Sequence, residues 1–187
     1  MKHIKSLRSK LAAFTLIELL VVISIIAVLA SLALPAITGA LVKGQITQTT
    51  SNYRQLYILT QTASLDNQQN GSSNAGFPAD IGGTLAAWSN GLINGGYITN
   101  TGLASLWNVQ GRPNTSALNI GVGSGSGSQN VFICTANITT TPGTAVSAFA
   151  GGQPYQLKGG SIVTVGGAAF SVIGTNLNTN NYTFGTN

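Results

Sequence analysis

Few side chains in this sequence could act as an acid, a base, a nucleophile or a metal ligand. Only 6% of the 187 residues are charged, and the chain has a single histidine, His3, and a single cysteine, Cys134. A zinc site needs several Cys or His ligands, and a catalytic triad would have to recruit His3 from a basic N-terminal segment. The sequence therefore argues against zinc binding and against most enzyme classes. A lone cysteine also allows no intramolecular disulfide, and we expect Cys134 to be a small buried strand residue.

The basic residues are concentrated at the N-terminus. The net charge is +5, but Lys2, Lys5, Arg8 and Lys10 all precede residue 11, so the remainder of the chain carries only +1. A nucleic-acid-binding face needs clustered Lys and Arg within the folded part of the protein. We therefore expect no nucleic-acid partner.

A long apolar segment follows this basic leader. No residue between Leu19 and Val42 carries a charge. Counted from Phe14, the apolar stretch reaches about 21 residues by Leu34, enough for a helix to cross a bilayer core of ~30 Å. Because basic residues favour the cytoplasmic side, the pattern predicts a single-pass helix with a cytoplasmic N-terminus.

Three other interpretations of this segment are a secretory signal peptide, a simple membrane anchor and a buried core helix. A signal peptide would be cleaved after Ala33 or Ala36, but its apolar region is normally shorter. Glu18 discriminates among the interpretations, because a carboxylate carried to the centre of a membrane helix costs about 2.5–3.5 kcal/mol. An acid there either reaches for the headgroups or pairs with a positive group within the membrane.

The segment from Lys10 to Leu20 reads Lys-Leu-Ala-Ala-Phe-Thr-Leu-Ile-Glu-Leu-Leu, and it resembles the class III leader junction of type IV prepilins and type II secretion pseudopilins. The resemblance implies that a prepilin peptidase cuts between Ala13 and Phe14 and methylates the new amine of Phe14. It makes Glu18 the fifth mature residue, with a role in assembly, and Pro35 a helix-breaking position. The usual residue before the cut is Gly, whereas this chain has another small residue, Ala13.

The resemblance also implies an architecture and a function. It implies an α+β, pilin-like fold, in which a long N-terminal helix packs on a small C-terminal antiparallel β-sheet head. The expected divisions are a leader peptide at 1–13, a transmembrane and filament-core helix at 14–38, its amphipathic continuation at 39–66 and an extracytoplasmic globular head at 67–187. The protein would be a structural subunit of an envelope filament and not an enzyme.

The implied location is the bacterial inner membrane, from which the subunit is extracted into a periplasmic or surface filament. The partners implied are further copies or related subunits, the prepilin peptidase and an inner-membrane assembly platform. We expect no cofactor, although calcium binding in type II major pseudopilins makes Asp80 a candidate metal ligand. Asp66 and Asp80 alone are too few for a cage of about six to eight oxygens without many backbone carbonyls. The sequence does not distinguish a type II secretion pseudopilus from a type IV pilus, although the missing cysteine pair slightly favours the former.

A helical pattern continues beyond the apolar segment. Pro35 lacks an amide hydrogen and should kink or locally melt the helix. Apolar and threonine side chains then recur at intervals of three and four residues, which predicts one buried face; they are Val42, Ile46, Thr49, Tyr53, Leu56, Tyr57, Thr60 and Ala63. One helix from about Phe14 to Leu65 is therefore expected.

The remaining segments predict short elements. A helix is expected over Thr84–Asn94, ending at Gly95-Gly96, followed by apolar pieces at Tyr97-Ile98 and 103–109. The expected strands are Val131–Cys134, Tyr155–Lys158, Ser161–Val165 and Ala169–Ile173, with Gly159-Gly160 as a hairpin turn. Gly121–Ser128 is expected to be a flexible linker, and it lacks the lysine of a phosphate-binding loop.

A different class of protein, a membrane-anchored binding module or adhesin, would share the helix without needing the peptidase cut. Trp88, Trp107 and the tyrosines could form a sugar-stacking surface, but core packing is the favoured interpretation of these aromatics. The mass of the mature N-terminus separates the filament subunit from the simple anchor.

Overall fold

The computed structural model describes residues 14–71, 74–109, 116–138 and 154–174. The chain forms two compact units, Met1–Ala40 and Leu41–Asn187. The leader at 1–13, with Ala13, and the tail from Thr175 lie outside the described residues.

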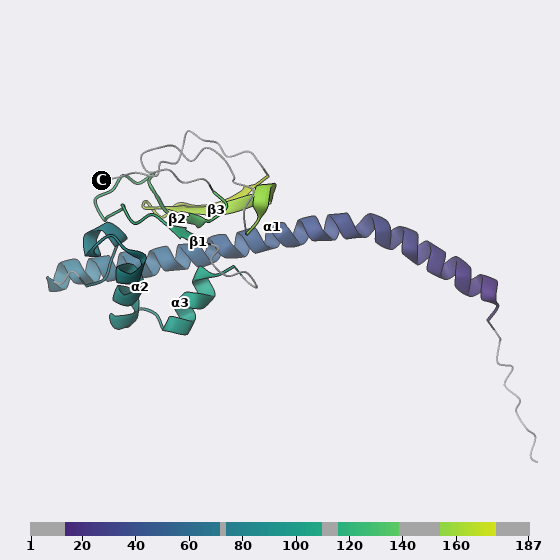
Figure 1. Ribbon diagram of the computed structural model, residues 1–187, viewed down its shortest axis with the longest axis horizontal. Helices are drawn as coiled ribbons and strands as arrows, with labels where there is room; N and C mark the ends of the chain where they lie inside the picture. The colour runs from purple at the N-terminus through teal and green to yellow at the C-terminus, as the bar shows by residue number, and fades with distance from the viewer. Residues whose placement is uncertain (1–13, 72–73, 110–115, 139–153, 175–187) are drawn as a thin grey trace, which may run out of the picture. The chain divides into compact units, whose positions relative to one another are not determined.

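The first element, α1, spans Leu16–Asn70 and has 55 residues (Figure 1). The expected helix is confirmed and extends five residues beyond Leu65. Within its apolar part, Ser24 donates a hydrogen bond to the carbonyl of Leu20 at 2.7 Å. Ser31 likewise bonds the carbonyl of Val28 at 2.8 Å. These hydroxyls are satisfied by the helix itself, so they do not oppose an apolar environment.

Three short helices follow in the second unit: the 3-10 helix η1 (Pro78–Ile81), α2 (Leu85–Asn94) and α3 (Asn100–Trp107). The Thr84 hydroxyl caps α2 by accepting the amide of Ala87 at 3.0 Å. Thr99 caps α3 in the same way, through Gly102. A threonine at the N-cap satisfies an amide that the helix leaves free. The α2 prediction is confirmed, whereas α3 was not predicted as a helix.

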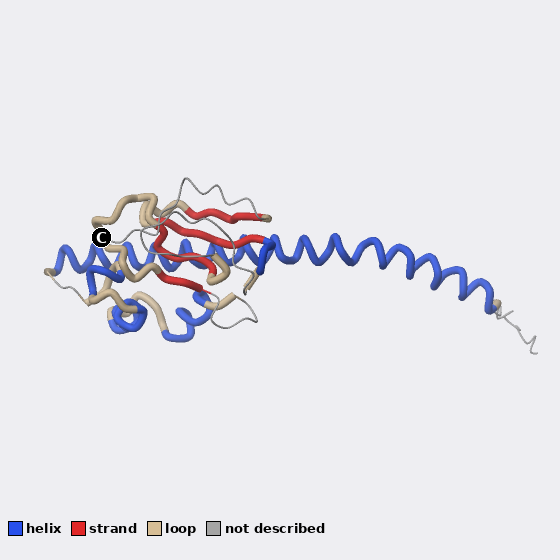
Figure 2. Tube along the Cα trace, turned by 45° about the horizontal axis from the view of Figure 1, so that its top comes forward, coloured by secondary structure: helices blue, strands red, loops and turns tan. Residues whose placement is uncertain are grey.

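The sheet has four strands, β1 (Ser116–Leu118), β2 (Val131–Thr135), β3 (Gly159–Thr164) and β4 (Ala169–Ile173). They lie in the order β1-β2-β3-β4, and every neighbouring pair is antiparallel. Figure 2 shows the strands in red. The long helix and small antiparallel sheet confirm the expected α+β class. Strands β2, β3 and β4 were predicted to within two residues, and β1 was missed.

Two predictions around Gly159 are wrong. Instead of a strand, Tyr155–Lys158 contains a 3-10 turn, η2 (Gln156–Lys158). Gly159 and Gly160 are not a turn but the first residues of β3, paired with Ile173 and Val172 of β4. A Cβ at Gly159 would lie 2.3 Å from the carbonyl oxygen of Val172, so this glycine serves close strand approach at a φ of 142°.

The true β3–β4 turn follows Thr164. Its tip contains Gly167, whose φ of 79° lies in the left-handed region that favours glycine. The amide of Gly167 donates to the carbonyl of Thr164 at 2.9 Å.

The glycine- and serine-rich segment 121–128 is a bonded turn and not the expected free linker. Val122 is buried, and its carbonyl accepts the amide of Ala79 at 3.0 Å. The amide of Gly123 donates to the hydroxyl of Ser126 at 3.0 Å. Composition suggested flexibility, but Val122 and the contacts with η1 hold the segment in place.

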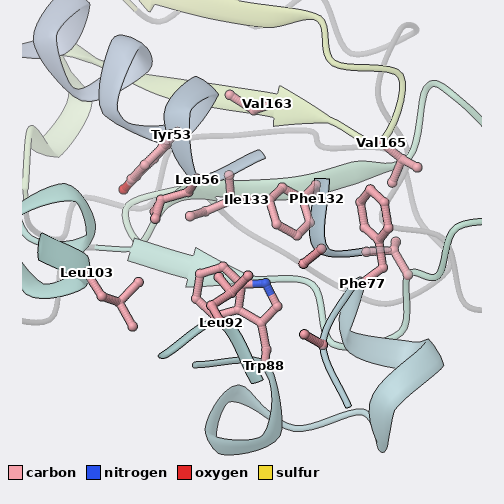
Figure 3. Close-up of a cluster of buried hydrophobic side chains, with 13 residues drawn as sticks. Tyr53, Leu56, Phe77, Trp88, Leu92, Leu103, Phe132, Ile133, Val163 and Val165 are labelled. Carbon is pink, nitrogen blue, oxygen red and sulfur yellow. The ribbon is translucent and has the colours of Figure 1, made fainter. Parts of the chain in front are cut away.

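The largest core cluster brings together α1, α2, α3, the loops beside η1, and the sheet (Figure 3). Phe132 of β2 lies at its centre, with ring centroids 5.4 Å from Phe77 and 6.1 Å from Trp88. Trp88 is fully buried and donates its indole N–H to Thr60 at 3.0 Å. Trp107 packs 5.6 Å from it. These tryptophans therefore build the core.

Candidate functional site

The N-terminal end of α1 is closed by a reciprocal pair of side chains, Thr15 and Glu18. Glu18 Oε2 accepts the amide of Thr15 at 2.8 Å and its hydroxyl at 2.7 Å. The Thr15 Oγ1 in turn accepts the amide of Glu18 at 3.3 Å. This is a capping box, in which each residue satisfies an amide that the first helical turn leaves unpaired.

The sequence contained the signal for this arrangement. Thr15-Leu-Ile-Glu18 has the spacing Thr-x-x-Glu directly before an apolar run, which is the pattern of a capping box. The sequence predicts a role in assembly for Glu18 through its charge, but we did not predict that Glu18 caps the helix. Glu18 therefore has a local structural role in addition to any role in pairing.

The surroundings of Glu18 are apolar. Phe14, Ile17, Val21 and Val22 line a shallow depression on the helix surface beside it. Among the described residues that follow Glu18, the first cation is Lys43, 25 positions further along the chain. If the chain is cleaved before Phe14, as predicted, the new amine of Phe14 would be the positive charge closest to Glu18 along the chain.

The predicted cleavage position lies just outside the helix. Ala13 is not among the described residues, whereas Phe14 is described, is 81% exposed and precedes α1. Exposed backbone outside regular structure is the usual substrate for proteolysis. The arrangement is compatible with cleavage before Phe14, which stays a prediction.

The first half of α1 exposes an apolar surface. Every residue from Phe14 to Leu41 is exposed, and α1 is long and apolar enough to cross a membrane. The large apolar side chains concerned are Phe14, Leu16, Ile17, Leu19, Leu20, Val21, Val22, Ile23, Ile25, Ile26, Val28, Leu29, Leu32, Leu34, Ile37 and Leu41. A contiguous surface of this kind marks a membrane or protein contact.

Pro35 lies within this surface. The helix continues through it without a break, although the carbonyl of Ser31 loses its usual amide donor. Thr38 donates its hydroxyl to the carbonyl of Pro35 at 3.0 Å. Apart from neighbouring residues and the helix's own backbone, no described atom lies within 4 Å of a Cβ placed at Gly39 or Gly44. Melting or kinking of the helix at Pro35 stays a prediction.

The acids of the head are engaged in local hydrogen bonds. Asp80 Oδ2 accepts the amide of Ser124 at 2.7 Å, and Asp66 accepts the hydroxyl of Tyr97 at 2.9 Å. Burial, together with the bond to Asp66, raises the pKa of Tyr97. Within the described ranges, no cluster of three or more His, Cys, Asp or Glu side chains could hold a metal ion. Calcium at Asp80 stays a prediction without support from neighbouring acids.

Cys134 is fully buried in β2, as expected from its strand pattern. Burial raises the pKa of its thiol far above the usual range. Because the thiolate is the reactive form, Cys134 is unsuited to nucleophilic or redox chemistry at neutral pH.

Comparison with known proteins identifies the N-terminal segment. The family described as "Prokaryotic N-terminal methylation motif" matches residues 8–34, a range that contains Ala13, Phe14, Thr15 and Glu18. The chain matches no curated protein and no solved structure. The motif characterises structural rather than catalytic proteins. The chain therefore carries the N-terminal methylation motif typical of type IV prepilin-like and pseudopilin-like proteins, and its long helix with a small antiparallel sheet fits a pilin-like α+β fold.

Proposed function

We propose that this protein is a structural subunit of a bacterial envelope filament, either a type II secretion pseudopilus or a type IV pilus. The proposal rests mainly on the match to the methylation motif over residues 8–34. The apolar first half of α1, exposed in the isolated chain, supports the proposal because such a surface needs a lipid or protein environment. In this proposal, the first half of α1 lies in the inner membrane, with the head outside the cytoplasm, and then enters the filament core.

Processing prepares the subunit for assembly. A prepilin peptidase removes residues 1–13 and methylates Phe14, and an inner-membrane platform then adds the subunit to the filament. Glu18 pairs with the Phe14 amine of a neighbouring subunit, because neither charge can stay unpaired cheaply in an apolar core. Pairing within one chain would neutralise Glu18 without directing the axial position of the incoming subunit.

The first experiment is mass spectrometry of the N-terminal peptide from envelope-purified protein. We expect a peptide that begins at Phe14 and carries one added methyl group. A control with Phe14 replaced by Ala in the same strain shows whether the observed terminus depends on the motif. A mature protein beginning at Met1, or near Ala36, would contradict the proposal and favour a simple anchor or a signal peptide.

The second experiment separates the charge of Glu18 from its capping role. Glu18→Gln keeps an oxygen that can accept the Thr15 amide, because Glu and Gln both serve in capping boxes. Thr15→Val is the matched variant: it removes the cap, at a cost of about 1 kcal/mol, and keeps the charge. We expect both proteins to be cleaved and inserted, with sheared-filament yield falling more than about tenfold for Glu18→Gln alone.

Other outcomes have clear meanings. Normal filament yield from a processed Glu18→Gln protein would exclude the pairing role. A loss from Thr15→Val as large as that from Glu18→Gln would show that the yield does not depend on the charge of Glu18 alone, and would contradict the expected difference.

Pro35 provides a third proposal about assembly. The backbone bond missing at Pro35, together with Gly39 and Gly44 downstream, makes this the weakest part of the helix, since each Gly costs about 1 kcal/mol relative to Ala. Stretching there would let subunits stack while their heads stay folded. A filament reconstruction with straight, unbroken helix through residues 30–44 would contradict this.

A further inference from the structure

One end of the head combines exposed apolar side chains with cations. Leu157 and Ile173 are 53% and 50% exposed, and exposed Lys158 directly follows Leu157 in the chain. Lys43 is also exposed and precedes Ile46, the α1 residue next to Gly159, by three positions. The amide of Gly174 bonds the carbonyl of Lys158 at 2.9 Å, which joins the end of β4 to η2. We call this surface the proximal end; it consists of Lys43, Leu157, Lys158 and Ile173.

The proximal end lies at the level where the helix enters the head. Ser161 donates its hydroxyl to the carbonyl of Ile46 at 2.9 Å, and Thr49 bonds the hydroxyl of Tyr155 at 2.7 Å. Val42 packs against the cluster that contains Ile46 and Tyr155. These contacts place η2 and the start of β3 against the first turns of α1 within the second unit.

Charge is distributed unequally along the head. The chain has only three acids, and Glu18 lies in the apolar helix, which leaves Asp66 and Asp80. Asp66 follows Lys43 by 23 residues, about 35 Å along α1. Asp80 contacts the turn at Ser124, at the far end of the sheet where Gly167 approaches Tyr57. The proximal end is therefore cationic without an acid to neutralise it.

We propose that the proximal end rests on a bilayer surface rich in anionic phospholipid while the subunit waits in the membrane. Lys43 is the first charged residue after the uncharged segment that ends at Val42, so the chain leaves the membrane next to this surface. Leu157 and Ile173 enter the headgroup boundary, and the two lysines meet lipid phosphates, a combination that suits an anionic interface. Extraction into a filament must break this contact.

The proposal rests on the proposed membrane anchoring but not on filament assembly, so the two can be tested separately. The full chain is reconstituted in vesicles of phosphatidylglycerol and phosphatidylethanolamine, with a thiol-linked fluorophore and nitroxide-labelled lipid as quencher. The probe is placed at Ile173→Cys, and its matched control is Ile120→Cys at the far end. The two isoleucines are 50% and 49% exposed, and buried Cys134 is left in place.

We expect strong quenching at position 173 and little at position 120. In phosphatidylcholine vesicles, or near 1 M salt where charge is screened within about 3 Å, quenching at 173 should fall. Lys43→Gln and Lys158→Gln should each lower the ratio of docked to free heads about fivefold. Arg54→Gln, which removes an exposed cation elsewhere on α1, should leave that ratio unchanged.

A probe at Leu29→Cys reports the helix itself. Quenching at 29 with equal quenching at 173 and 120 would overturn the docking proposal and leave the anchor intact. No quenching at 29 would overturn both. A further outcome is a fluorescence at position 173 that depends on the number of protein copies per vesicle and not on the amount of nitroxide-labelled lipid. That result would assign the surface to a second copy of the chain and overturn the lipid assignment.

Discussion

The two halves of α1 have opposite patterns of burial. From Leu16 to Leu41 the residues are mostly apolar and all exposed, whereas Thr49, Thr50 and Thr60 in the second half are buried. The second half has folded against its own sheet and helices, whereas every residue from 16 to 41 in the first half stays exposed and none is buried among the described residues. The comparison shows that hydropathy describes the surroundings a segment needs, while burial shows whether its own chain supplies them.

The buried polar residues form a seam between α1 and the sheet. Thr50 bonds both Ser161 and Ser171 at 2.8 Å, and Tyr53 bonds Ser116 at 2.6 Å. Hydrogen bonds are directional, so the seam specifies the position of the helix against the strands. Apolar burial is not directional. In the first half, the hydroxyls of Ser24, Ser31 and Thr38 bond carbonyls of their own helix, and Glu18 is the charged group that could provide similar specificity.

The largest expected difference between the halves concerns leucines. Leu56→Ala should lower the free energy of unfolding of the head by about 2–5 kcal/mol, because it leaves a cavity at a fully buried position. Leu29→Ala, at an exposed position of the same helix, should change it by less than about 0.5 kcal/mol. Chemical denaturation of the detergent-solubilised full chain, followed by tryptophan fluorescence, measures both. Equal effects would mean that the halves unfold as one unit.

A smaller effect is expected from breaking the polar seam. Thr50→Val keeps the shape of the side chain but removes the group that bonds Ser161 and Ser171, at a cost of about 1–3 kcal/mol in unfolding free energy. Thr47→Val is the control, because Thr47 is exposed and its hydroxyl bonds the carbonyl of Lys43 within the same helix. If the two variants unfold at the same denaturant concentration, the seam contributes nothing measurable.

The smallest effect is a dependence on alkaline pH confined to the head. Burial holds the pKa of Tyr53 far above its usual range, whereas Tyr53 in the unfolded chain ionises near pH 10. The folded state thus retains a proton that the unfolded state releases, so stability is fully present below about pH 10 and falls by about 1.4 kcal/mol per pH unit above it.

The Tyr53→Phe variant has no phenol to ionise at this position, so its unfolding free energy should lack this decline at high pH. The difference in unfolding free energy between the wild type and Tyr53→Phe should be constant from about pH 7 to 9 and should decline near pH 11. A difference that does not vary with pH would show that Tyr53 is not protected in the folded state. The first half of α1 contains no tyrosine, so it should not take part.

Local sequence signals were sufficient for elements whose cause is local. The unbroken helical pattern predicted α1, and Thr84 with Gly95-Gly96 predicted the limits of α2. The leader junction predicted a prepilin-like protein before the family match over residues 8–34. The capping box was also readable, because its donor and acceptor are three residues apart.

Tertiary structure decided the features that depend on distant partners. Gly159-Gly160 has the composition of a turn, but pairing with Ile173 and Val172 makes it the start of a strand. The short strand β1 exists because Ala117 and Leu118 pair with β2. Thr50 meets Ser161 and Ser171 across 111 and 121 residues of chain. A hydroxyl in a helical sequence pattern does not indicate whether a strand hydroxyl will lie against it. The hydrogen bond between them becomes necessary only when helix and sheet pack together and exclude water.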